Sequence, residues 1–146
     1  MGYDLIAKKK ETEDFSIGAF TWPIMLQETG MGYLLGYGKN VEPSSYVYQE
    51  GGKGSPVSND GYTVSSFEAK AMAKMARGFI SVKRFINSRY DKMSEVDKEM
   101  HKTYKSYNPD DGTSKKLYEQ PISEEYLLKL EKFADFAEKC GGFSIH

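Results

Sequence analysis

The sequence predicts an α+β fold, a small and mostly antiparallel sheet with two main helices packed on one of its faces. Two observations support this prediction. Short segments at both ends of the chain have the apolar or alternating pattern of strands, and two longer segments repeat apolar residues with helical spacing. A chain of 146 residues has the length of one domain. We therefore expect a single domain over residues 1–146 with two long connections, at about 38–62 and 88–122.

A hairpin is expected at the start of the chain, pairing residues 2–7 with residues 15–20. The first segment is mainly apolar, and the second alternates apolar with small or polar side chains, as a half-buried strand does. A short helix, 22–29, is expected next. Thr21 is expected to be its N-cap, and Gly30 its C-terminal stop.

The longest expected helix begins at a capping box. Ser65 has the side chain of an N-cap, and Glu68, three residues later, is placed to bond back to it. Apolar residues then recur at helical spacing and predict the buried stripe. This stripe consists of Phe67, Ala71, Met75, Phe79, Val82 and Ile86. The helix is expected to end near residues 87–90.

A last helix, 124–139, is expected to be capped by Ser123. Its predicted buried stripe consists of Tyr126, Leu127, Leu130, Phe133, Ala134 and Ala137, with Phe136 beside it. Two glycines end the helix, and residues 143–145 are expected to return as a terminal strand. The two long connections are expected to hold a strand at 45–49 and a polar helix at 94–104.

Charge, cysteine content and the terminal sequence exclude several classes of protein. Lys and Arg total 20 and Asp and Glu total 21, a net charge of -1, so we expect no duplex nucleic acid as partner. The only cysteine, Cys140, cannot form an intrachain disulfide. With the two histidines it falls short of the four ligands of a structural zinc site, so we expect neither a metal nor a cofactor. No signal peptide or membrane segment is seen, which predicts a cytoplasmic protein with no membrane partner.

Aromatic residues make up 14% of the chain and lead to the functional prediction. Most phenylalanines fit the predicted core stripes, whereas most tyrosines lie in or beside the long connections. Tyrosine offers a large, rigid contact area with a polar end, and it is enriched at binding surfaces. The tyrosines therefore either form such a surface or fasten the connections to the body of the protein.

The first of these interpretations predicts a pocket for a small anionic or nucleotide-like ligand. Aromatic rings would stack on the ligand, cations would supply charge, and polar side chains would read its edges. The expected ligand-binding residues are the rings Trp22, Tyr33, Tyr37 and Tyr62, the cations Lys70, Lys74 and Arg77, and the polar residues Asn59 and Asp60. The sequence indicates no catalytic residue.

Several short motifs stand at both ends of the chain and before the long helix. They are Met1–Leu5, Phe20–Pro23, Asn59–Gly61 with Val64–Ser65 and Glu68–Ala69, and Phe133 and Phe136 with Cys140–Ile145. In these motifs the chain resembles a loose group of small uncharacterised bacterial and phage proteins, which open with a Met-Gly-x-Asp-Leu-like strand and close with a Gly-Gly-Phe-x-Ile-like strand. The resemblance implies one domain with both termini in the sheet, and a phage or mobile-element origin. By analogy, such a protein would inhibit a host system.

We therefore expect a non-enzymatic binding protein, a phage accessory or anti-defence protein that sequesters a small anionic or nucleotide-like ligand, with a homo-oligomer as one way to complete the pocket. Two alternatives stay open. One is a protein-interaction inhibitor whose Tyr-rich loops bind a host protein, and the other is a small hydrolase with a pair of carboxylates. The first predicts a concave pocket at the junction of loop and helix, the second a flat or convex tyrosine patch, and the third two carboxylates that converge in a cleft.

Overall fold

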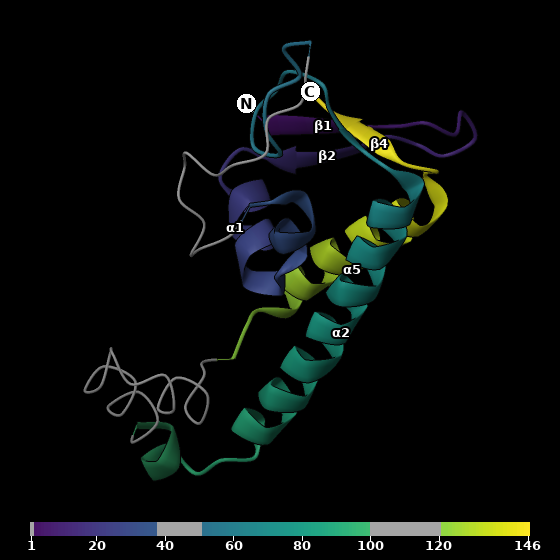
Figure 1. Ribbon diagram of the computed structural model, residues 1–146. Helices are drawn as coiled ribbons and strands as arrows, with labels where there is room; N and C mark the ends of the chain where they lie inside the picture. Colours follow the sequence, from purple (N-terminus) through teal and green to yellow (C-terminus); the bar gives the residue numbers. More distant parts are fainter. Residues whose placement is uncertain (1, 38–50, 100–120) are drawn as a thin grey trace.

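The computed structural model describes residues 2–37, 51–99 and 121–146, and it confirms the α+β fold (Figure 1). In chain order its elements are β1 (Gly2–Ala7), β2 (Phe15–Gly18), α1 (Thr21–Thr29), the short 3-10 helix η1 (Met31–Leu35), β3 (Tyr62–Val64), α2 (Ser66–Asp91), α5 (Glu124–Lys139) and β4 (Phe143–Ile145). The strand predicted at 45–49 lies outside the described residues. Of the polar helix predicted at 94–104, residues 95–99 are helical, and those from 100 on lie outside the description.

The four strands form one antiparallel sheet in the order β2-β1-β4-β3. The predicted hairpin and the predicted terminal strand are both confirmed, because β1 pairs with β2 on one side and with β4 on the other. Every second residue is buried along β1, β3 and β4, as expected for strands with one covered face. Helices α1, α2 and α5 cover that face and leave the other face open (Figure 1).

The core lies between the sheet and the helices. Its largest fully buried side chain is Trp22 of α1. The Trp22 ring lies 5.5 Å from the ring of Phe133 in α5 and 6.5 Å from that of Phe143 in β4, measured between centroids. One indole therefore joins three elements that are far apart in the sequence.

The ends of α1 test two predicted capping residues. Gly30 ends the helix as predicted, with a left-handed backbone (φ of 78°) that glycine adopts without steric cost. The prediction for Thr21 was wrong. The helix already includes Thr21, its N-cap is Phe20, and no side chain caps it. Thr21 therefore lies one position too late to bond the first free amides of the helix.

The capping box of α2 is confirmed. The Ser65 hydroxyl accepts a hydrogen bond from the amide of Glu68 at 3.1 Å, and the Glu68 carboxylate accepts one from the amide of Ser65 at 3.0 Å. The predicted stripe was wrong in part, because α2 turns mainly another side to the core, although Met75 and Phe79 of the stripe pack against the edge of the core. Its buried residues are Ala69, Met72, Ala73, Ala76, Ile80 and Lys83. Phe67 and Val82 of the predicted stripe are 81% and 57% exposed, and its other members are half-buried.

The neighbouring helix explains this choice of side. Three of the buried α2 residues are alanines, and α5 supplies bulky side chains opposite them, among them Leu130 and Phe133. Small residues on one helix let a helix with large residues approach closely. The stripe predicted for α5 is confirmed for Leu127, Leu130, Phe133, Ala134, Phe136 and Ala137. Tyr126 is only partly buried, and burial together with nearby Glu28 raises its pKa to about 12.

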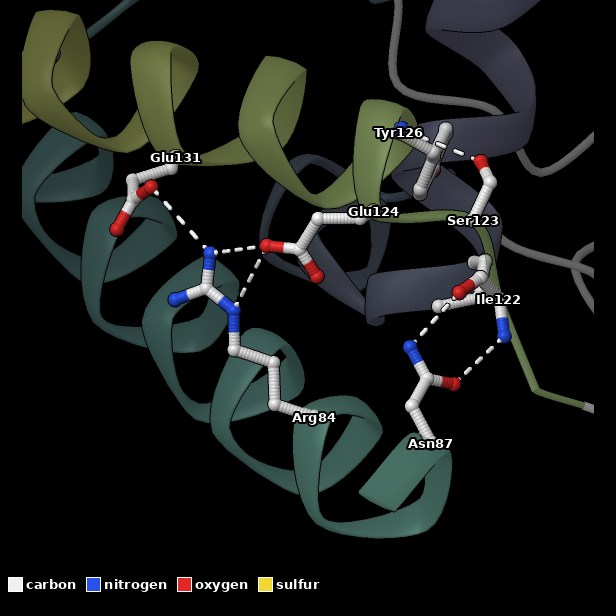
Figure 2. Close-up of polar contacts among 7 residues, drawn as sticks. All are labelled: Arg84, Asn87, Ile122, Ser123, Glu124, Tyr126 and Glu131. Atoms are coloured by element: carbon white, nitrogen blue, oxygen red, sulfur yellow. Dashed lines mark hydrogen bonds and ion pairs between the residues drawn. The ribbon is translucent and has the colours of Figure 1, made fainter. Parts of the chain in front are cut away.

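Polar contacts join the end of α2 to the start of α5 (Figure 2). The Asn87 side-chain amide donates to the Ile122 carbonyl oxygen at 2.8 Å, and its oxygen accepts from the Ile122 amide at 3.0 Å. The Arg84 guanidinium binds the Glu124 carboxylate at 2.8 Å and approaches that of Glu131 at 3.5 Å. Both acids are largely exposed, and exposed ion pairs contribute little to stability. The two hydrogen bonds of Asn87 are therefore the polar contacts that contribute most to the stability of this junction between α2 and α5.

We expect Asn87→Ala to lower the free energy of unfolding by about 1–3 kcal/mol, because it leaves two partly buried backbone groups of Ile122 without their partner. Ser88→Ala is the matched control, since Ser88 is exposed on the same turn of α2, and it should change stability by less than about 0.5 kcal/mol. Urea unfolding followed by circular dichroism measures both. Equal urea midpoints for the two variants would show that the hydrogen bonds of Asn87 do not stabilise the junction between α2 and α5.

Candidate functional site

Three of the four rings expected to stack on a ligand lie in the core. Trp22 is 0% exposed, and Tyr62 and Tyr37 are buried as well. The Tyr37 hydroxyl accepts a hydrogen bond from the side-chain amide of Gln27 at 3.2 Å. Only Tyr33, on η1, is open to solvent, with 55% of its surface exposed. A ligand stacked on Trp22, Tyr37 or Tyr62 would have to open the core first.

Aromatic side chains instead hold the described part of the first long connection. The indole Nε1 of Trp22 donates to the Pro56 carbonyl oxygen at 2.9 Å, and the Tyr3 hydroxyl donates to that of Val57 at 2.8 Å. Burial raises the pKa of both Tyr3 and Tyr62, so both hydroxyls stay neutral at physiological pH. In this part of the chain, aromatic residues fasten the connection to the body. Tyr46, Tyr48, Tyr104, Tyr107 and Tyr118 lie outside the described residues.

The phenylalanines mostly lie in or against the core, as predicted, but the prediction was wrong for three of them. Phe133, Phe136 and Phe143 are buried, but Phe20, Phe67 and Phe85 are strongly exposed. Two of the exposed rings, Phe67 and Phe85, belong to α2. The physical reason is that α2 carries apolar residues on two sides, and the side with the small ones packs against α5.

The polar residues predicted to read a ligand lie at one end of the sheet. Asn59 and Asp60 are exposed, and the Asn59 amide donates to the carbonyl oxygen of Gly2 at 3.3 Å. Helix α2 begins at the opposite end, beside the pair of Val64 with Phe143. The six residues of β1 that separate the two ends span about 17 Å. The structure thus does not bring Asn59 and Asp60 together with the predicted cations.

The three predicted cations share one flank of α2. The Arg77 guanidinium binds the carboxylates of Asp135 and Glu138 on α5 at 2.8 and 3.0 Å. Lys70 and Lys74 are exposed, and within the described ranges neither has an ion-pair partner. The positive charge of Arg77 is therefore compensated, and that of Lys70 and Lys74 is not.

Next to this flank lies what we call the outer face of α2, formed by Phe67, Ala71, Gly78, Val82 and Phe85. Phe67 and Phe85 are 81% and 70% exposed. They stand eighteen positions apart, which is five full helical turns, so both rings point to the same side. Exposed aromatic rings in register on one helix are unusual on a free surface, whereas they are typical of contact sites.

Gly78 lies near the middle of the outer face. A Cβ atom added there would have nothing within 4 Å, so no packing within the described chain requires a glycine. Glycine inside a helix costs about 1 kcal/mol relative to alanine. Sequence reasoning missed this face because it assigned the large apolar residues to the core. The signal that could have revealed it was that apolar residues occupy more than half of the circumference of α2.

The open face of the sheet offers the strongest candidate for hydrolytic chemistry. The Ser144 hydroxyl lies 2.9 Å from Nε2 of His146, and the Ser16 hydroxyl donates to the Asp4 carboxylate at 2.6 Å. A shallow hollow of about 330 Å³ is lined by Asp4 and Ser16 but not by Ser144 or His146, and Asp4 is the only acid in its lining. Glycoside hydrolysis by paired carboxylates needs two, so this hollow provides no site for it.

Two further candidates for reactive or metal-binding chemistry are the cysteine and groups of His, Cys, Asp and Glu side chains. Cys140 is buried, and burial raises the pKa of its thiol, which lowers the share of the nucleophilic thiolate. In residues 2–37, 51–99 and 121–146, no three His, Cys, Asp or Glu side chains are grouped to hold a metal ion. No described helix is long and apolar enough to cross a membrane.

Comparisons with models of protein families, with curated proteins and with solved structures find no match to this chain.

Proposed function

We propose that the chain is a protein-binding module and that the outer face of α2 is its contact surface. The observation that supports this most is the register of Phe67 and Phe85, two exposed rings on one side of a single rigid helix. Exposed aromatic residues lose an unfavourable contact with water when a partner covers them. They are also the residue type that dominates the energy of protein interfaces.

The helix around these rings favours a protein over a small ligand. α2 is packed against α5 along its opposite side and is capped at its start. The outer face is therefore the convex side of a helix that is held in place by the rest of the fold. Small ligands prefer concave sites that bury most of their surface. Proteins bind to convex ridges, with contact areas near 800 Å² on each partner. The proposed surface therefore differs from the tyrosine loops expected from the sequence.

A selection from a library of displayed peptides against the immobilised protein tests the proposal. We expect enriched peptides whose affinity falls at least about tenfold for the double variant Phe67→Gln/Phe85→Gln, because two contact rings are lost. The double variant Ile24→Gln/Leu128→Gln is the matched control. It removes two exposed apolar side chains from α1 and α5 and should leave binding unchanged.

The same selection shows how the proposal would fail. If no peptide is enriched, or if the enriched peptides bind the Phe67→Gln/Phe85→Gln variant as well as the original protein, the outer face is not the contact surface. Circular dichroism should confirm that the variant keeps its fold, which is expected because both rings are exposed.

A further inference from the structure

We infer that the partner bound by the outer face is an acidic amphipathic helix, which lies along α2 and comes closest to it at Gly78. This inference rests on the proposed function and adds the chemistry of the partner. Three features of the described residues support it, namely the shape of the outer face, the hydrogen bonding of the α2 backbone and the distribution of charge around the face.

The shape of the outer face fits a helix. Large rings, Phe67 and Phe85, stand at its two ends, and the small residues Ala71 and Gly78 lie between them, with the exposed Lys74 one turn before Gly78. The rings are about 27 Å apart along the axis, at 1.5 Å per residue. A helix of about five turns spans this distance. Small residues in the middle let its axis approach α2 to the short end of the usual 8–10 Å.

The backbone of α2 favours a helix over an extended strand as partner. An added strand gains most of its affinity from hydrogen bonds to free backbone groups at a sheet edge. The inner backbone groups of α2 are bonded along the helix, and its first turn is closed by the Ser65 and Glu68 caps. A partner on this face is therefore held by side chains, for which the i, i+3 and i+4 spacing of an amphipathic helix is suited.

The charge around the outer face calls for acidic side chains on one flank of the partner. Lys70 and Lys74 lie on the flank shared with Arg77, and neither has an ion-pair partner within the described residues. The other flank is apolar and half-buried. There Met75 reaches towards Gly30, with its Cε atom 3.4 Å from the place of an added Cβ. The complementary helix thus has Glu or Asp beside the lysines and apolar residues elsewhere.

A second copy of α2 is a poorer occupant. In an antiparallel pair related by a twofold axis, the same flanks meet. Lys70 and Lys74 of one copy would then lie along the flank of the other copy that also carries Lys70, Lys74 and Arg77, and like charges repel. In a parallel pair the lysines would instead meet the apolar flank around Met75. Neither arrangement supplies the missing carboxylates.

Two synthetic helical peptides of about 20 residues test the inference. They share the same apolar positions, and one has Glu and the other Lys at the flanking positions. Fluorescence anisotropy at low salt should show at least about tenfold tighter binding of the Glu peptide, and this preference should weaken as salt is added. The variant Lys70→Glu/Lys74→Glu should prefer the Lys peptide. Lys129→Glu/Lys132→Glu changes the charge equally on exposed positions of α5 and should keep the original preference.

A bulky variant tests the closest approach separately. Gly78→Leu should weaken binding of the Glu peptide at least about tenfold, because its side chain fills the space that the partner helix needs. Circular dichroism and thermal unfolding check the fold of this variant, which should be intact because the space at Gly78 is open. Unchanged affinity of Gly78→Leu for the Glu peptide would overturn the placement at Gly78.

The remaining outcomes separate the inference from the proposed function. If selected peptides depend on Phe67 and Phe85 but show no preference for acid, or if neither synthetic peptide binds, the acidic helix is overturned while the contact surface stands. If sedimentation equilibrium shows a dimer that Phe67→Gln/Phe85→Gln abolishes, the occupant is a second copy. If no selected peptide depends on the two rings, the proposed function fails as well.

Discussion

Trp22→Ala is expected to lower the free energy of unfolding by about 3–5 kcal/mol, the usual cost of replacing a buried large aromatic residue by alanine. The Trp22 ring is fully buried, touches the rings of Phe133 and Phe143, and donates to the Pro56 carbonyl oxygen. The substitution opens a cavity in the core and leaves the Pro56 oxygen without this donor. For a domain whose total stability is about 5–15 kcal/mol, this loss is a large share of the total.

Tyr33→Ala is the matched control for Trp22→Ala. Both residues were expected from the sequence to stack on a ligand, but Tyr33 is largely exposed, so its loss should cost less than about 0.5 kcal/mol. Urea unfolding followed by far-UV circular dichroism measures both variants, because Trp22 is the only tryptophan and its fluorescence is lost with it. A Trp22→Ala protein as stable as the original would show that the indole is not a core residue.

Gly142→Ala is expected to cost about 2–5 kcal/mol, the sum of a strained backbone and a steric clash. Gly142 directly precedes β4 and has a φ of 99°, a backbone conformation that residues with a side chain rarely adopt. An added Cβ would lie 2.8 Å from the carbonyl oxygen of Val64 and 3.1 Å from the amide of Ser66. The methyl group would therefore push β4 away from the junction of β3 and α2.

Gly78→Ala is the matched control for Gly142→Ala, and the expected change has the opposite sign. Gly78 is helical and has open space around it, so alanine should raise the stability by up to about 1 kcal/mol. Thermal unfolding of the two variants gives the comparison directly. Destabilisation by Gly78→Ala, or none by Gly142→Ala, would contradict these assignments.

Local signals in the sequence predicted the three long helices, the N-terminal hairpin and the terminal strand, but they missed β3 and η1. Residues of the right type stand at Ser65 with Glu68, at Ser123 and at Gly30, and each acts as the predicted cap or stop. Such signals are reliable because a cap contacts only residues within one helical turn. Thr21 has the same chemistry one position too far along the chain, and α1 begins without a side-chain cap.

The candidate site could not be predicted in this way, because its residues are those of α2 that no other element of the fold covers. Phe67 and Phe143 are the same amino acid, yet one is exposed and the other is buried in the core. Lys74 and Arg77 are both cations on α2, but only Arg77 meets acids of α5. These differences depend on which residues of distant elements lie opposite.

The sequence by itself determined the α+β class, the strands at both ends of the chain and the positions of three helices. These features follow from periodicity and capping, which act over a few residues. Only the tertiary structure decided which side of α2 faces the core. α2 is apolar on two sides, and burying its alanines lets the bulky residues of α5 pack closely. That choice leaves Phe67, Val82 and Phe85 outside, and it places the proposed contact surface on α2.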